Sequence, residues 1–557
     1  MHLTRLPICI FGLLLAGCGG GRSSDDSAVA QASSGQVAAT ASYKVSHYAA
    51  SRFAEQASFG PTPALVAELR SKGFERWIDD QFALPLRPID TAPVERYTTR
   101  TPSQAERDHL RVAFAAKAYA APDQLRQRLL WSLSQWVVAG LNKGEPAGHT
   151  HWVNLLERNA LGNYRTLLRE AALNPHMAHF LDNDQNRPKS AECGYCAPNE
   201  NFARELMQLF TLGVFKLNGD GTAQRDGRGR LIETYTQRDV EELARVLTGW
   251  MHDPEPANRP EQNWGNWGRP MVASTWPPNR DSGSKSVLGK FFPAAQSGSR
   301  DLDDALDLLM GHPNIGPFVA LRLIQHLVKS DPSPAYVGRV AAKFRNNGSG
   351  VAGDMKALVK AVLLDAEARA GDDPARSSGS DGKMREPVLH FSALFRGLGC
   401  QRAPVDSNGY AWQAGNQPFF NPSSVFSFYA PTDRAPGSNL LAPEQKLLTA
   451  NEFTSRLSQL AWVRWDNKLK RNNPAVLGNA GCDLQPFVQA YARGVKPFND
   501  LLGERFFRGA MPHTLRSNIE QQIARPTWDT TETASPDEGP VRMIGLALST
   551  PYFGVIK

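Results

Sequence analysis

The chain has 557 residues, of which 41% are hydrophobic, and a formal net charge of +7. This length exceeds the usual range of a single domain, so it predicts either one large domain with insertions or two domains. Lys and Arg are spread along the chain without a basic run. The charge therefore argues against nucleic-acid recognition and favours loose contact with acidic envelope polymers or headgroups.

Residues 1–17 have the pattern of a bacterial lipoprotein signal peptide. A positively charged start is followed by a short apolar stretch that ends in Leu15-Ala16-Gly17 before Cys18. The stretch is too short to span a bilayer as a helix. We therefore expect Cys18 to be lipidated and to become the mature N-terminus. An ordinary cleaved signal peptide that happens to contain a cysteine is the alternative.

Residues 18–45 predict a flexible tether, because they are rich in Gly, Ser and Ala and have no large apolar side chain before Tyr43. Gly19 follows the cysteine where inner-membrane lipoproteins often have Asp, so we expect an outer-membrane protein that faces the periplasm or the cell surface. Two or three acyl chains would give a stable anchor, since one chain binds only reversibly. Residues 46–557 form the predicted body, with a candidate subdivision at 370–382.

Export leaves four cysteines in the mature chain: Cys193, Cys196, Cys400 and Cys482. In an oxidising compartment they allow three pairings, and the sequence does not choose among them. For Cys193 and Cys196 we favour a local disulfide that stiffens the loop before Asn199. A redox site or half of a zinc site also fits this CxxC spacing, but neither a second CxxC nor a thioredoxin-like context accompanies it.

Helical patterns dominate the body. Pro122 and Gly140 mark the start and stop of an amphipathic stretch through Val138. Further helices are predicted at residues 62–72, 148–159, 163–173, 301–310, 314–329, 334–346, 353–369, 384–398 and 446–465. The clear strand signal is a hairpin over 215–235, punctuated by Asn-Gly and Asp-Gly turns. The predicted fold is thus mainly α, a large multi-helix domain with a small β-hairpin insertion and long aromatic-rich loops.

Two of those long loops, 251–300 and 400–440, hold many aromatic residues among Gly, Pro and Asn. Long loops in compact domains tend to be functional or disordered, and aromatic residues argue against disorder. Trp264, Trp267 and Trp412 are therefore candidate binding residues, because flat rings offer faces to sugars or apolar ligands. The alternative is that these rings pin the loops to the helical body.

A third feature is the stretch PNENFARELMQLFTLG, residues 198–213, which predicts an amphipathic helix capped by Asn199 and ended by Gly213. Its polar face carries Glu200, Arg204 and Glu205. If another element covers that face, one carboxyl group could stay protonated near neutrality while the other stays charged. If the face is open to water, Glu200 and Arg204 form an ordinary helix ion pair.

The next helix, predicted from Thr236 to Trp250, has a capping-box start in which Asp239 takes the usual position of Glu. It contributes Asp239 to the same candidate site, and Asn199 and Asn201 are candidate binding residues beside it. His149, His151, His176 and His179, with Asp182 or Asp184, could hold zinc, but no HExxH-like signature supports this, so we predict no metal and no cofactor.

Several ordered motifs resemble the bacterial domain-of-unknown-function eighteen-hundred family. They include FAEQASFGPT (53–62), GNYR (162–165), PNENFAREL (198–206), TQRDV through LTGW (236–250), HPNIGPF (312–318) and KMREPV (383–388). The resemblance covers roughly residues 46–435, with the whole mature chain as the wider alternative. It implies an exported, mostly helical protein, often encoded beside a sulfatase-like or alkaline-phosphatase-like partner, and it implies no established activity.

This sequence departs from that family at one place. Many relatives have a histidine-aspartate pair ahead of the Lys-x-x-Leu-Gly block, whereas here Asn279, Arg280 and Asp281 stand there. If that histidine is catalytic in relatives, this protein has lost or changed the step. His252 is a candidate spatial substitute.

Two functions of different class follow. One is a non-catalytic envelope lipoprotein that binds an envelope partner or assists its export. The other is a hydrolase or lyase acting on an envelope polysaccharide, with Glu205 as acid, Glu200 or Asp239 as base and Arg204 positioning the substrate. We favour the first, because the sequence has no nucleophile elbow, metal signature, phosphate loop or dinucleotide fingerprint.

Overall fold

The computed structural model describes residues 44–95, 101–254, 266–378, 381–401, 415–456, 482–525 and 538–557. The chain divides into two units, Met1–Ser42 and Tyr43–Lys557, and every described residue belongs to the second unit. The predicted signal peptide, Cys18 and nearly all of the tether lie outside the described residues.

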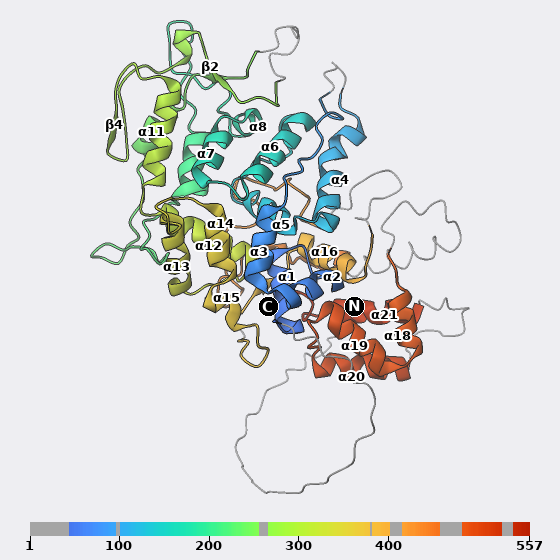
Figure 1. Cartoon of the computed structure of the whole chain (residues 1–557). Helices are drawn as coiled ribbons and strands as arrows, with labels where there is room; N and C mark the ends of the chain where they lie inside the picture. Colours follow the sequence, from blue (N-terminus) through green and yellow to red (C-terminus); the bar gives the residue numbers. More distant parts are fainter. Residues whose placement is uncertain are drawn as a thin grey trace, which may run out of the picture. The chain divides into compact units, whose positions relative to one another are not determined.

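The second unit is mainly α-helical, as the sequence predicts (Figure 1). Its α-helices are α1 (His47–Ala57), α2 (Pro63–Lys72), α3 (Phe74–Ala83), α4 (Gln104–Ala120), α5 (Gln124–Leu133), α6 (Pro146–Asn159), α7 (Tyr164–Ala172), α8 (Pro175–Phe180), α9 (Asn201–Glu205), α10 (Gln237–Val246), α11 (Gly298–Met310), α12 (Ile315–Leu327), α13 (Pro334–Arg345), α14 (Met355–Leu363), α15 (Ala366–Ala370), α16 (Pro387–Gly397), α18 (Gln485–Ala492), α19 (Val495–Phe506), α20 (His513–Ala524) and α21 (Glu538–Leu548).

Other elements are short. They are the π-helix η1 (Leu206–Thr211), the 3-10 helices η2 (Pro277–Asn279) and η3 (Pro443–Leu447), and the strands β1 (Trp250–Met251), β2 (Val272–Ala273), β3 (Lys285–Val287), β4 (Lys290–Phe292), β5 (Lys383–Met384) and β6 (Val555–Ile556). The strands pair antiparallel as β1 with β2, β3 with β4 and β5 with β6. The last pair brings Lys383 opposite Ile556, so the C-terminus closes onto the middle of the chain.

Side-chain caps set many of the helix starts. The hydroxyls of Ser46, Thr62 and Ser333 accept hydrogen bonds from backbone N–H groups in the first turns of α1, α2 and α13. Such caps satisfy N–H groups that the helix itself leaves without a partner. This local chemistry is why the predicted and observed bounds of α2, α7 and α13 agree within about one residue.

Some predicted helices end earlier or break. The predicted helix 353–369 is two helices, because Asp365 caps a new start at α15 through the backbone N–H of Glu367. The predicted 236–250 helix ends at Val246, and Trp250 pairs with Ala273 in a strand. The stretch predicted at 446–465 contains the end of η3 and helical residues 450–456, and positions 457–465 are outside the described residues.

The hairpin over 215–235 is confirmed in its backbone hydrogen bonds, although its pairs are isolated bridges and not continuous strands. Phe215 lies opposite Glu233, and Arg225 lies opposite Leu231. Asn314, at the start of α12, holds the base of the hairpin, since its amide donates to the carbonyls of Leu212 and Phe215.

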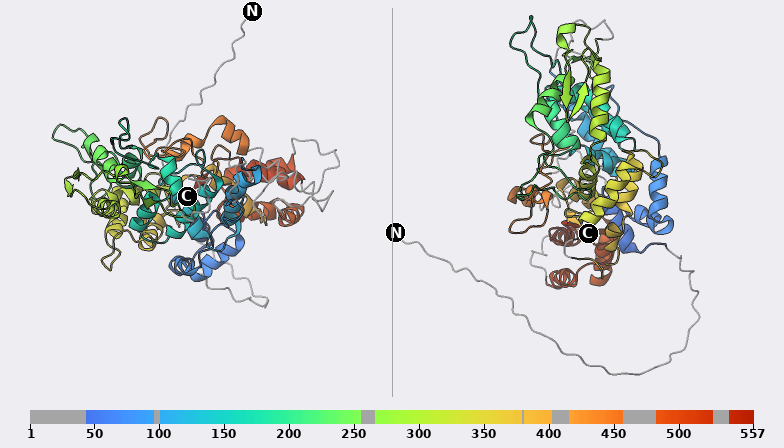
Figure 2. Two further views of the ribbon diagram at one scale, coloured as in Figure 1. Left: turned by 90° about the horizontal axis from the view of Figure 1, so that it is seen from above. Right: turned by 90° about the vertical axis from the view of Figure 1, so that its left-hand side faces the viewer.

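One hydrophobic cluster runs through nearly all the described helices. The helices α12, α13 and α14 pack together, and α18–α21 form a group of their own that contacts α16 through α19. Figures 1 and 2 show this C-terminal group in red at the opposite end of the molecule from α7, α8 and α11. The region of the 198–213 motif therefore lies far from the C-terminal helices.

A buried ion network fixes the centre of this body. Lys383 Nζ lies 2.8 Å from Glu386 Oε1 and 3.2 Å from Glu444 Oε1, and it donates to the carbonyl of His326 at 3.3 Å. Gln417 donates to the other oxygen of Glu386 at 2.8 Å. Burial alone would raise the pKa of Glu386, but the charges of Lys383, His326 and Arg128 together outweigh it and hold that pKa well below its ordinary value.

Lys383→Met should cost roughly 3–5 kcal/mol of unfolding free energy, because it leaves two carboxyl groups buried without their cation. Urea unfolding of both proteins measures the difference. Lys496→Met is the matched control: it removes an exposed partner of Asp500 and should change stability by less than about 0.5 kcal/mol. Equal losses in the two variants would contradict a structural role for the network.

Candidate functional site

The motif of residues 198–206 forms a short helix that runs straight into a π-helix. Residues Asn201–Glu205 make α9, and Leu206–Thr211 continue as η1, where Thr211 Oγ1 donates to the carbonyl of Leu206 at 2.6 Å. A single amphipathic helix over 199–213 is therefore the wrong description of this segment. A π-turn is rare and often marks a functional site, because the extra residue per turn redirects side chains.

Glu200 and Arg204 lie at the edge of the site. Arg204 Nη2 donates to Glu200 Oε2 at 2.7 Å, and the two side chains are 37% and 35% exposed. Gln237 of α10 joins both, since its Nε2 donates to Glu200 and its Oε1 accepts from Arg204. The Glu200–Arg204 ion pair is half-exposed, so it contributes little to stability, and its hydrogen bonds to Gln237 link α9 to α10.

Glu205 has the opposite environment. Although it follows Arg204 directly, it is only 9% exposed, and its Oε2 has no hydrogen-bond partner among the described residues. Burial raises the pKa of Glu205 from 4.5 to about 7, and the charge of Arg204 opposes this shift. One carboxyl group of the motif is therefore partly protonated near neutral pH. The sequence predicts this for the case in which another element covers the polar face of the helix.

Asp239 has a structural position. Its Oδ2 accepts from the backbone N–H and hydroxyl of Thr236, and its Oδ1 accepts from the backbone N–H of Leu288 at 2.7 Å. Burial opposes ionisation, but these hydrogen bonds outweigh it and lower the pKa of Asp239. The carboxylate caps α10 and ties it to the β3–β4 hairpin, so it has little capacity left for a substrate.

The proton on Glu205 should make stability depend on pH. Because the folded protein holds this proton more tightly than the unfolded chain, the unfolding free energy falls as pH rises from about 4.5 to about 7. Glu205→Gln cannot ionise, so the variant should gain stability relative to the parent between pH of about 5 and about 8. The urea concentration at the unfolding midpoint, measured for both proteins at pH of about 5 and about 8, gives this gain. Glu241→Gln, at an exposed position of α10, is the control, and a pH-independent difference for Glu205→Gln would contradict the buried proton.

An open polar pocket of about 350 Å³ lies beside this motif. Its wall consists of acidic, amide and imidazole side chains together with one guanidinium and a disulfide sulfur, from His179, Asp182, Asp184, Gln185, Asn186, Arg187, Cys196, Ala197 and Asn199. The segment 182–187 follows α8 and supplies most of the polar groups. The Asn- and Asp-rich composition of that segment was the available sequence signal, and only Asp182 and Asp184 of it are predicted to have a role there, as candidate zinc ligands.

Hydrogen bonds hold the pocket wall in place. Asp182 has a left-handed backbone with φ of 56°, and its carboxylate receives Lys143 at 2.9 Å and the amide of Asn201 at 2.7 Å. Asn186 Oδ1 accepts from the backbone N–H of Asn199 at 2.7 Å. Asn199 and Asn201, both predicted binding residues, are thus connected to the pocket, and strained backbone of this kind is frequent at binding sites.

Behind the pocket, histidines gather around Trp267. The ring of Trp267 lies 5.2 Å from that of His252 and 5.8 Å from that of His179, and it is only 6% exposed. His252 Nε2 lies 3.3 Å from Asp184 Oδ2. Trp267 therefore packs inside this cluster and offers no open face to a ligand, in contrast to its predicted role as a binding residue.

Burial favours the uncharged form of His149 and His176. Burial lowers the pKa of His149 to about 4, and burial together with the neighbouring His149 lowers that of His176 well below its ordinary value. His149 Nε2 contacts the carbonyl of Lys143, and His151 pairs with Glu95. Within the described ranges, no three His, Cys, Asp or Glu side chains come together in a way that could hold a metal ion.

The comparison with protein families decides the relationship. The model of the family described as "Protein of unknown function (DUF1800)" matches residues 52–555. The chain belongs to this family. No curated protein and no solved structure gives a significant match. Membership confirms the resemblance drawn from the motifs, and it carries no activity with it.

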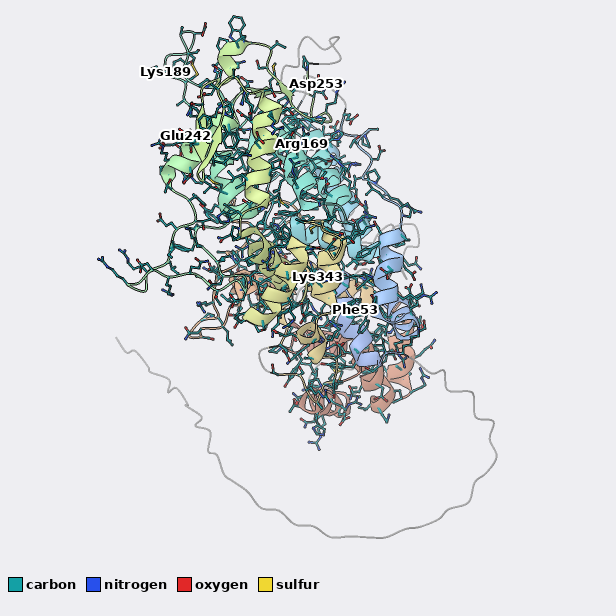
Figure 3. All side chains as sticks on the ribbon, turned by 60° about the vertical axis from the view of Figure 1, so that its left-hand side comes forward. Phe53, Arg169, Lys189, Glu242, Asp253 and Lys343 are labelled. Atoms are coloured by element: carbon teal, nitrogen blue, oxygen red, sulfur yellow. A yellow bond between two sulfur atoms is a disulfide. The ribbon has the colours of Figure 1, made fainter. Side chains whose placement is uncertain are left out.

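Family motifs of this DUF1800 protein converge on the site. The motif at 198–206 forms α9, the motif starting at Thr236 forms the start of α10, and these helices pack against each other. Figure 3 labels Glu242 of α10, which faces β3, since its Oε2 accepts from the backbone N–H of Ser286 at 2.9 Å. The motif at 383–388 instead builds the buried ion network, so it serves the core.

The position where relatives have a histidine-aspartate pair is structural here. Arg280 pairs with the buried Asp301 and donates to the carbonyls of Val246 and Thr248. Asp281 pairs with Arg245 at 2.8 Å. These contacts fasten the end of α10 to α11. His252, the candidate substitute, instead faces Asp184 and Trp267 behind the polar pocket.

Disulfides join Cys193 to Cys196 and Cys400 to Cys482. The first closes a tight turn that presents Tyr195 with 90% of its surface exposed, and Arg187 Nε contacts Cys196 Sγ at 3.2 Å. Lys189, labelled in Figure 3, lies at the outer edge of the molecule in the loop that leads to this turn.

The other aromatic candidates divide into two groups. Trp264 and Trp412 lie outside the described residues. In the loop after 415, Phe419 and Phe420 are buried and pack edge-on against Phe114 and Trp131. These two rings pin the loop to α4 and α5, which is the alternative that the sequence left open. No described helix is both long enough and apolar enough to cross a bilayer.

Proposed function

We propose that this protein is an exported lipoprotein of the cell envelope, anchored through Cys18, that binds a hydroxyl-rich envelope partner such as a polysaccharide. The lipobox-like residues before Cys18 and the short apolar stretch ahead of them support the anchor. The polar pocket beside Asn199 is the binding site in this proposal.

The observation that carries the proposal is the chemistry of the pocket wall. The carboxylate of Asp184, whose Oδ1 has no hydrogen-bond partner among the described residues, and the amide of Asn199 border a cavity of about 350 Å³. Carboxylates accept and amides both donate and accept, which matches the hydroxyl groups of a sugar. The volume lies within the roughly 300–1,000 Å³ of small-ligand sites, so it takes one or two sugar units and leaves the rest of a polymer outside.

The neighbouring groups favour binding over catalysis. Asp239 is occupied by backbone N–H groups, and Glu200 is paired with Arg204 at the surface. The exposed Tyr195 on the disulfide-closed turn adds a rigid aromatic face beside the pocket. A ring of this kind contributes contact area at a low entropic cost.

The purified chain should retain a polysaccharide fraction of the bacterial envelope, and Asp184→Asn should weaken that binding about tenfold, because a charged acceptor is lost from the pocket. Biolayer interferometry with immobilised polysaccharide measures the affinity. Asp226→Asn, on the exposed hairpin, is the matched control and should bind like the parent. Equal affinity of both variants for the polysaccharide would exclude this pocket as the binding site. Recovery from envelope extracts of a sulfatase-like or alkaline-phosphatase-like protein without any glycan would exclude a polysaccharide as the partner.

A hydrolase or lyase acting on an envelope polysaccharide is the second candidate, and the buried Glu205 favours it. A carboxyl group with a pKa of about 7 is suited to donate a proton to a leaving group at neutral pH. In this candidate Glu205 is the acid, Glu200 the base or stabiliser, and Arg204 positions the substrate.

The catalytic candidate makes a separate prediction. The parent should release reducing ends or unsaturated sugars from the polysaccharide, and Glu205→Gln should lower that rate by about 10²–10⁴-fold, the usual contribution of a general acid. The same variant should still bind the polysaccharide, since Glu205 does not line the polar pocket. A parent that binds the polymer but releases no product would exclude the catalytic function and leave binding as the proposed function.

A further inference from the structure

A second, apolar cavity of about 590 Å³ lies beside the β5–β6 pair. Apolar side chains from separate segments make most of its wall: Met384, Leu440, Leu448, Phe453, Leu548 and Val555. This volume is well inside the range of sites that enclose a small molecule. The cavity is independent of the polar pocket, because the two share no residue.

One cation in this wall has an unmet donor. Arg456 is largely buried, with Nε donating to Glu452 at 2.9 Å and Nη2 donating to the carbonyl of Arg385 at 3.1 Å. No described residue accepts a hydrogen bond from its Nη1. Nη1 is therefore the nitrogen of this guanidinium that can donate to an oxygen acceptor in the cavity.

A buried imidazole stands in the same wall. His390 packs edge-on against Phe391 and Phe553, and its Nδ1 has no hydrogen-bond partner within the described part of the chain. Burial and the nearby Arg456 and Arg385 lower the pKa of His390 well below its ordinary value. It is therefore a neutral side chain that adds no charge to the cavity wall, and its Nδ1 is buried.

The other charged groups of the wall are occupied or acidic. Lys383 already makes three contacts with Glu386, Glu444 and the carbonyl of His326. Asp381 accepts from the backbone of Ser378 and lies 3.5 Å from Lys329, and Asp331 also borders the cavity. An anionic group would be repelled by the two aspartates and attracted to Arg456, which fixes the end of the cavity where it can lie.

We propose that this cavity binds a fatty acid, with the acyl chain along the apolar wall and the carboxylate on Arg456 Nη1. A mostly apolar wall with one cationic nitrogen left for an acceptor matches a ligand that has a single small anionic head and an apolar tail. This site is separate from the polysaccharide site and does not depend on it.

Isothermal titration of the purified full chain with sodium dodecanoate, kept below micelle-forming concentrations, tests the site. We expect saturable binding of one molecule per chain. Dodecan-1-ol has the same tail without the charge. Its affinity should therefore be lower by at least about tenfold, the loss expected for a charge-assisted hydrogen bond. Absence of saturable dodecanoate binding, or equal affinity for the alcohol, would overturn the proposal.

Two variants locate the ligand. Arg456→Gln should lower dodecanoate affinity about tenfold and remove the preference over the alcohol. Because this residue is buried, a second variant avoids the core: Leu440→Trp fills the cavity from an exposed position and should abolish binding of both ligands. Leu231→Trp, at a similarly exposed leucine in the hairpin, is the control. Unchanged dodecanoate affinity in Leu440→Trp would place the ligand elsewhere and overturn the assignment.

Discussion

The buried ammonium of Lys383 is the contact on which the rest of the body depends. Its three partners are Glu386 at the start of α16, Glu444 in η3 and the carbonyl of His326 near the end of α12. Gln135, just after α5, also donates to Glu386 at 3.2 Å. A charge without water requires every one of these partners in place. The network therefore fixes how segments that are distant in sequence meet, which hydrophobic contact alone specifies less strictly.

A second buried set extends this constraint to the chain ends. Glu55 of α1 accepts from Arg385 and from Arg508, partners that are 330 and 453 positions away. Arg385 also lies over the ring of Phe553, next to the β5–β6 pair. The first helix, the middle of the chain and its C-terminus are thus joined at one place. The apolar cavity borders the same strand pair, so its shape depends on these ion pairs as well.

The two candidate sites differ in character because their surroundings differ. The polar pocket lies beside loops that are held by Asn186 and a disulfide, and its wall is rich in polar groups. The apolar cavity lies beside the β5–β6 pair and is lined mostly by apolar side chains, with Arg456 at one end. Glu205 belongs to neither wall; its unusual proton affinity comes from burial of its side chain at the end of α9 and not from a partner carboxylate.

The sequence by itself determined the helical class, the hairpin, the starts of helices such as α2, α7 and α13, and the family, because caps, prolines and apolar periodicity act over a few residues. Tertiary structure alone decided that α9 continues as a π-helix, that Glu205 is buried while Glu200 is half-exposed, and that Trp267 lies among histidines. It also decided which of the charged residues in the 383–388 motif pair with Glu55 and Glu444. Burial and ion pairing depend on segments hundreds of positions apart, and no local pattern records which of them will meet.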